Sequence, residues 1–147
     1  MNKLISFKTA TKLSLVIFSL LALFHLVIII GIVLFDYAPI EYLWGGRMET
    51  KNQLLGFEFI SFFITLLSVI VVLIHDQSLS KPRFKKVAHI FIWVLFVMFV
   101  LNTAGNIVAE TNFEKSFAVV TLTLAILCLR MALEKKEGLK NQDNDKL

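Results

Sequence analysis

Four long apolar segments, separated by short polar ones, dominate the pattern along the chain. They cover residues 13–35, 54–74, 87–109 and 117–133. As helices rising 1.5 Å per residue, they are about long enough to cross a hydrocarbon layer of roughly 30 Å, the last one only just. Lipid offers no partner to unpaired backbone groups, and four segments are too few to close a barrel. The pattern therefore predicts an all-α integral membrane four-helix bundle with short loops.

Composition supports lipid as the solvent of this chain. Hydrophobic residues make up 57% of the 147 residues, and the mean hydropathy is +0.77, more apolar than an ordinary soluble domain. Three lysines precede the first segment, as in a secretory signal, but its apolar stretch is too long and no small-residue cleavage pattern follows. We therefore expect one transmembrane domain over residues 1–133 and a charged, disordered cytoplasmic tail over residues 134–147.

The distribution of basic residues predicts an orientation. Twelve of the 15 Lys and Arg residues lie before the first segment, between the second and third, or at the end of the fourth and in the tail. Short loops rich in Lys and Arg stay in the cytoplasm. Both termini are therefore expected inside, and the minimal loops favour a bacterial inner (plasma) membrane. The net charge of +4 is interpreted as attraction to the membrane surface, with no nucleic-acid partner.

Polar residues recur at helical spacing inside the apolar segments. Glu58, Ser61, Thr65 and Ser68 follow one another at steps of three or four, which places them on one face of a helix. A polar group facing lipid is costly, so such faces should turn toward each other in the bundle. The candidate ligand or proton site consists of Glu58, His25, Asn102, Asn106 and Thr121. Small side chains in the fourth segment, Cys128 among them, predict close helix packing there.

Glu58 is the most informative of these residues, because an ionisable group within a membrane helix suggests a function. It follows the loop sequence Trp44, Gly45, Gly46 and Arg47. One hypothesis is that Glu58 pairs with Arg47 or a loop amide and anchors this loop over the bundle. The other is that Glu58 binds a ligand. The sequence favours neither.

Other chemistries find little support. His25 stands alone in its segment, which indicates a hydrogen-bonded core histidine more than a metal ligand. A single cysteine excludes an intramolecular disulfide and a CxxC redox pair. We find no nucleophile with a base and no phosphate-binding loop. No catalytic residue, metal site or cofactor is therefore assigned, and an enzyme is the less favoured class.

The leading functional hypothesis is a nonenzymatic membrane protein that binds a partner through helix packing and the WGGR loop. The partner would be a second copy, another membrane protein or a lipid. The alternatives are a proton-coupled carrier of a small molecule that uses Glu58, and a lipid-modifying enzyme with Glu58 and His25 as acid and base. If Glu58 and His25 lie together in one cavity, a carrier or an enzyme is favoured; if they lie apart, packing is favoured.

Overall fold

The computed structural model describes residues 5–76 and 82–134. It contains the helices α1 (Phe7–Phe35), α2 (Lys51–His75), α3 (Pro82–Ile107) and α4 (Asn112–Ala132), with two short 3-10 turns, η1 (Ile40–Tyr42) and η2 (Trp44–Gly46), between α1 and α2. All four α-helices are long and apolar enough to span a membrane. The chain is thus a multi-pass helical membrane protein. Most of the predicted charged tail, residues 135–147, lies outside the described residues.

Helices α1, α2 and α4 begin earlier than the apolar segments because polar residues cap their first turns. Ser6 caps α1, and Thr111 caps α4 by accepting a hydrogen bond from the backbone N–H of Glu114. Thr50 and Gln53 form a reciprocal capping box at the start of α2. Each cap satisfies backbone groups that a helix end leaves open.

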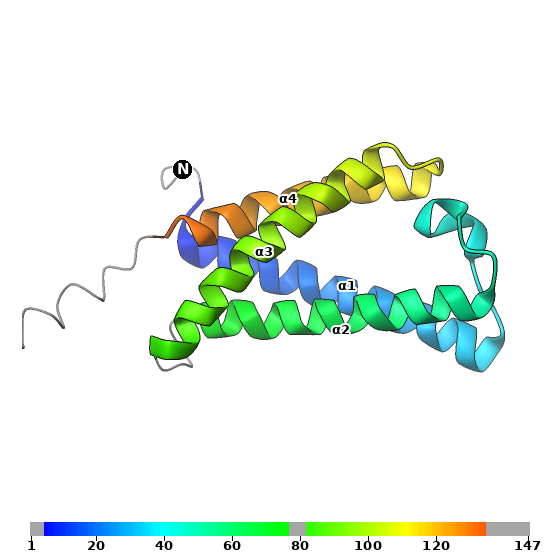
Figure 1. The fold of residues 1–147 in the computed structure, drawn as a ribbon, viewed down its shortest axis with the longest axis horizontal. Helices are drawn as coiled ribbons and strands as arrows, with labels where there is room; N and C mark the ends of the chain where they lie inside the picture. The colour runs from blue at the N-terminus through cyan, green and yellow to red at the C-terminus, as the bar shows by residue number, and fades with distance from the viewer. Residues whose placement is uncertain (1–4, 77–81, 135–147) are drawn as a thin grey trace, which may run out of the picture.

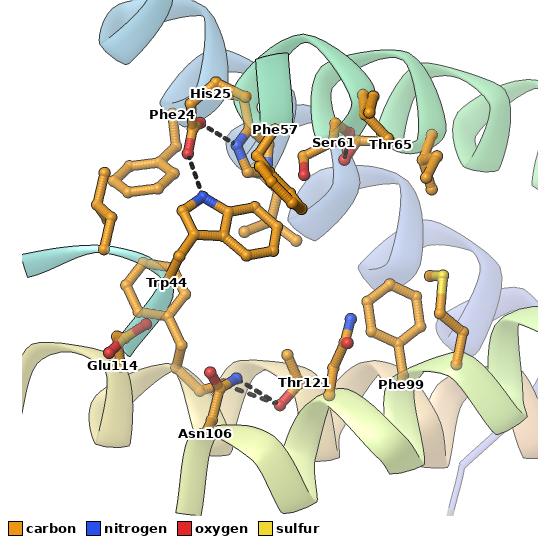
Figure 2. A pocket seen from close by; sticks show the side chains of 18 of the residues that line it. Phe24, His25, Trp44, Phe57, Ser61, Thr65, Phe99, Asn106, Glu114 and Thr121 are labelled. Carbon is orange, nitrogen blue, oxygen red and sulfur yellow. Dashed lines mark hydrogen bonds and ion pairs between the residues drawn. The ribbon is translucent and has the colours of Figure 1, made fainter. Parts of the chain in front are cut away.

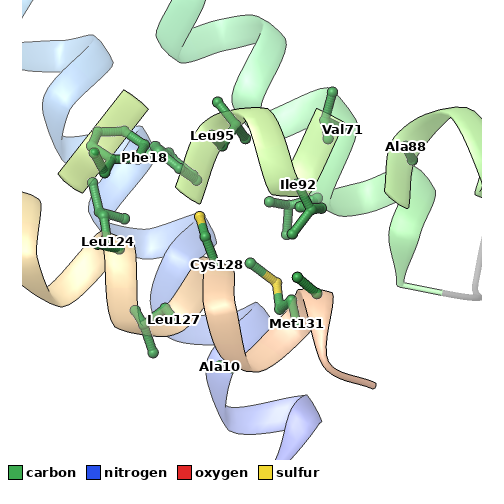
Figure 3. Close-up of a cluster of buried hydrophobic side chains, with 14 residues drawn as sticks. Ala10, Phe18, Val71, Ala88, Ile92, Leu95, Leu124, Leu127, Cys128 and Met131 are labelled. Atoms are coloured by element: carbon green, nitrogen blue, oxygen red, sulfur yellow. The ribbon is translucent and has the colours of Figure 1, made fainter. Parts of the chain in front are cut away.

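The four helices form two hairpins, α1–α2 and α3–α4, that meet at one end of the molecule (Figure 1). At that end, which carries the start of α1 and the end of α4, all four helices contribute to one apolar core. Figure 3 shows Phe18, Ile92, Leu124 and Met131 as members of this cluster, with the small side chain of Cys128 among them. Small residues let helices approach closely. The predicted small-residue face of the fourth helix therefore packs inward.

At the opposite end, which we call the loop end, the hairpins move apart (Figure 1). A second apolar cluster there joins Ile28, Ile32 and Leu54 of the first hairpin to Leu43 of the connecting loop. This cluster holds the loop against α1 and α2 and draws no residue from α3 or α4. The helices of the two hairpins thus diverge at the loop end, where the loop lies between them and Phe24 of α1 contacts Phe117 of α4.

A buried arginine fastens the start of the chain at the other end. Arg130, in the last turn of α4, donates from Nε to the carbonyl oxygen of Ile5 (2.8 Å) and from Nη1 to Glu134 (2.6 Å). Its side chain is 4% exposed. Arg130 is one of the basic residues at the end of the fourth apolar segment that predict a cytoplasmic position, but its buried side chain has an internal, structural role.

Candidate functional site

A pocket of about 390 Å³ lies between the two hairpins toward the loop end; we call it the interhairpin pocket. All five residues of the predicted ligand or proton site line it: Glu58, His25, Asn102, Asn106 and Thr121. Ser61, Thr65 and Ser68 line it as well, so the polar face predicted for the second helix points into this space. Its size falls at the lower end of the range for small-molecule sites.

Glu58 lines the pocket and accepts hydrogen bonds from two other lining residues, His25 and Trp44. Its side chain is 1% exposed. His25 Nδ1 lies 2.7 Å from Oε2, and the indole N–H of Trp44 donates to Oε1 at 2.9 Å. An ionised carboxylate can only accept, so with Glu58 ionised the hydrogen sits on Nδ1 of His25. Glu58 thereby joins α1, α2 and the loop.

His25 lies near the middle of the first apolar segment and Glu58 near the start of the second, yet the two side chains meet. Helix α1 starts at Phe7, well before the apolar segment, so His25 falls in the half of that helix nearer the loop end. The antiparallel α2 brings Glu58 to the same level in its second turn. The two side chains therefore share one cavity, the arrangement that favours a carrier or an enzyme over packing alone.

The loop reaches Glu58 through Trp44 and not through Arg47. Arg47 is exposed. One oxygen of Glu58 bonds to His25 and the other to Trp44. The predicted loop amide contact exists with a different acid: the backbone N–H of Gly45 donates to Oε1 of Glu114 at 2.6 Å. The loop therefore connects to α2 through a side chain and to α4 through its backbone.

The backbone of this loop explains its two glycines. Trp44, Gly45 and Gly46 have φ angles of 56°, 71° and 64°. Glycine adopts these left-handed values without the steric cost of a Cβ atom. Trp44 bears that cost, about 1–2 kcal/mol, and its hydrogen bond to Glu58 offsets part of it. Strain retained at one residue beside a buried carboxylate is typical of a functional position.

The α3–α4 side of the pocket carries the amides and hydroxyls. Thr121 accepts a hydrogen bond from Asn106 Nδ2 (3.4 Å), and its hydroxyl lies 3.0 Å from that of Thr103. These contacts join the two helices, while Asn106 still borders the cavity (Figure 2). Asn102 lines the pocket one turn away. Both asparagines therefore remain available to a ligand.

Two parts of the lining were not predicted from the sequence. Glu114 faces the pocket from the first turn of α4, where it also accepts a hydrogen bond from Thr111 Oγ1 at 3.0 Å. The spacing of Thr111 and Glu114 is that of a capping box, which could have indicated a helix start but not a pocket. The second part is aromatic: five phenylalanines line the cavity, Phe24, Phe57, Phe99, Phe113 and Phe117. In an apolar segment nothing distinguishes them from lipid-facing ones.

Within the described residues, no group of three or more potential metal ligands comes together. No family model, curated protein or solved structure matches the chain. The chemistry of the interhairpin pocket is therefore the basis for inferring a function.

Proposed function

We propose that this integral membrane protein binds an amphiphilic small molecule or lipid in the interhairpin pocket. The observation that carries the proposal is a mostly apolar cavity with a buried polar centre, Glu58 with His25 and Trp44, at one side. Small-molecule sites have this composition, in which apolar walls provide affinity and a few placed polar groups orient the ligand. A lipid is one of the partners expected from the sequence.

A pocket-filling substitution tests this function. Ser61 lines the pocket, so Ser61→Phe places a ring inside it, whereas Leu67→Phe adds a ring at an exposed position of the same helix. The protein is purified in mild detergent and analysed by native mass spectrometry. We expect a bound amphiphile on the native and Leu67→Phe proteins, and its loss from Ser61→Phe. Equal retention by all three would contradict binding in the pocket.

A second candidate is the proton-coupled carrier, favoured by the 2.7 Å contact between His25 and Glu58 in the pocket lining. A carboxyl and an imidazole at this distance can pass a proton between them as a ligand enters. In sealed vesicles, we expect a compound-dependent proton flux that Glu58→Gln abolishes and Glu110→Gln, at an exposed acid outside the pocket lining, retains. No flux with any of a panel of cationic and lipidic compounds would exclude the carrier and leave binding alone.

We further propose that both termini face the cytoplasm of a bacterial cell, which places the loop end outside. The support is the basic-residue asymmetry of the sequence. Cys128 is buried and can be replaced by alanine, so that single cysteines at the exposed positions Glu41 and Lys8 report on the two faces. An impermeant maleimide should label Glu41→Cys on intact cells and leave Lys8→Cys unlabelled. The reverse pattern would invert the orientation.

A further inference from the structure

The lining of the interhairpin pocket combines two features that select for a cation. The first is aromatic. Trp44 joins the five phenylalanines around the cavity, and the rings contact one another: Trp44–Phe57 at 5.0 Å, Phe113–Phe117 at 5.2 Å and Phe24–Phe117 at 5.3 Å between centroids. The face of an aromatic ring carries negative potential and attracts ammonium groups, most strongly where water is excluded.

The second feature is charge. Glu58 and Glu114 line the pocket from opposite hairpins, and among its described lining residues there is no lysine or arginine. With both carboxylates ionised, the formal charge of the lining is negative whether His25 is neutral or protonated. An anionic head group would therefore meet repulsion, and a cationic one attraction.

The hydrogen-bond donors near the two carboxylates also favour a cationic ligand. The N–H groups of Trp44 and His25 are used by Glu58, and the N–H of Gly45 is used by Glu114. Recognition of a phosphate or carboxylate needs such donors, and those nearest to the two carboxylates are already engaged. An alkylammonium head group needs none of them, because it interacts through charge and through ring faces.

We infer that the ligand of the interhairpin pocket is an amphiphile with an alkylammonium head group. The head group lies between Glu58, Glu114 and the aromatic rings. The alkyl chain of the ligand leaves the pocket past Ile60 and Ile64. These two residues line the pocket and are also 58% and 40% exposed. This inference rests on the proposed binding function and adds the chemical class of its ligand. A free cationic amphiphile and a lipid with an ammonium head group share this chemistry.

The two tryptophans of the chain make the ligand class measurable. Trp93 does not line the pocket. In the Trp93→Phe protein, Trp44 is therefore the sole tryptophan, and its emission reports on the pocket. This protein, in uncharged maltoside micelles, is titrated with decyltrimethylammonium, decyl sulfate, decanol and decylphosphocholine. We expect a saturable change in Trp44 emission with decyltrimethylammonium at an affinity about tenfold above those for decyl sulfate and decanol. Saturation by decylphosphocholine as well would identify a lipid head group as the source, and its absence a free cation.

Paired variants in the same background test the two features separately. Glu114→Gln removes a pocket charge, and Glu110→Gln removes an exposed charge near the same end. Phe117→Leu removes a ring face from the pocket, and Phe63→Leu does so at a position that is 64% exposed. The pocket variants should weaken decyltrimethylammonium about fivefold, and their controls less than about twofold.

The outcomes separate the ligand class from the binding function. Saturable binding of all four probes with equal affinity, abolished by Ser61→Phe, would retain the pocket and overturn the ammonium class. Saturation by none of them would overturn both. If Glu114→Gln fails to fold, Phe117→Leu still decides: affinity equal to that of Phe63→Leu contradicts the inference.

Discussion

Replacing Glu58 with alanine is expected to lower the free energy of unfolding by about 1–3 kcal/mol. The substitution removes the acceptor of two side-chain donors, His25 and Trp44, in a site where Glu58 itself is 1% exposed. It also releases Trp44 from its left-handed conformation. Thermal unfolding in mild detergent measures the loss of stability. A red shift of Trp44 emission, in the Trp93→Phe background, measures release of the loop.

Two control substitutions separate the carboxylate's role as an acceptor from its charge. In Glu58→Gln the amide oxygen can accept from Trp44 while the amide nitrogen donates to His25 in its other tautomer, so we expect less than about 1 kcal/mol of destabilisation. Glu49→Ala changes an exposed acid of the same loop and should alter stability by less than about 0.5 kcal/mol. A Glu58→Ala protein as stable as Glu49→Ala would show that Glu58 does not hold the loop.

Replacing Arg130 with methionine is expected to cost about 1.5–3 kcal/mol, the range for hydrogen bonds made by a charged donor. The methionine fills much of the same buried space but leaves the carbonyl of Ile5 without its donor at 2.8 Å. Ile5 and Phe7 pack against the core at this end, so the first turn of α1 should loosen. Thermal unfolding and hydrogen exchange of residues 7–12 measure the two effects.

The partner residue provides the control for Arg130. Glu134 is 38% exposed, and pairs of this kind contribute little in water. Glu134→Gln should therefore change stability by less than about 0.5 kcal/mol and leave exchange in α1 unaltered. If Glu134→Gln were as destabilising as Arg130→Met, the ion pair and not the bond to Ile5 would fasten the start of the chain.

The helices could be predicted from sequence because apolar runs long enough to span lipid have few other solutions. Their first residues were less predictable, since Ser6, Thr50 and Thr111 extend each helix into polar sequence by capping. Capping depends on local hydrogen bonds and leaves no hydrophobic signal. These three helices therefore begin several residues before the apolar segments that predicted them.

The sequence predicts which helix faces form the candidate site, but it does not predict the side-chain contacts between them. The spacing of Glu58, Ser61 and Thr65 places them on one side of α2, and the cost of polar groups in lipid turns that side inward. The meeting of Glu58 with His25 depends on where α1 begins and how two antiparallel helices align. The contribution of Glu114 depends on how the loop crosses between the hairpins. Neither contact can be predicted from residues that are near one another in the sequence.

Binding in the interhairpin pocket is tested most directly by contact quenching of the two tryptophans. Bromine quenches indole emission at close range, so a brominated alkyltrimethylammonium and a brominated fatty alcohol each report where their chain lies. With Trp44 as the sole tryptophan, at least one probe should quench to a plateau that Ser61→Phe removes. With Trp93 alone, through Trp44→Phe, quenching should rise without a plateau, because Trp93 lies outside the pocket lining. Identical quenching without a plateau at both tryptophans would contradict ligand binding in this pocket.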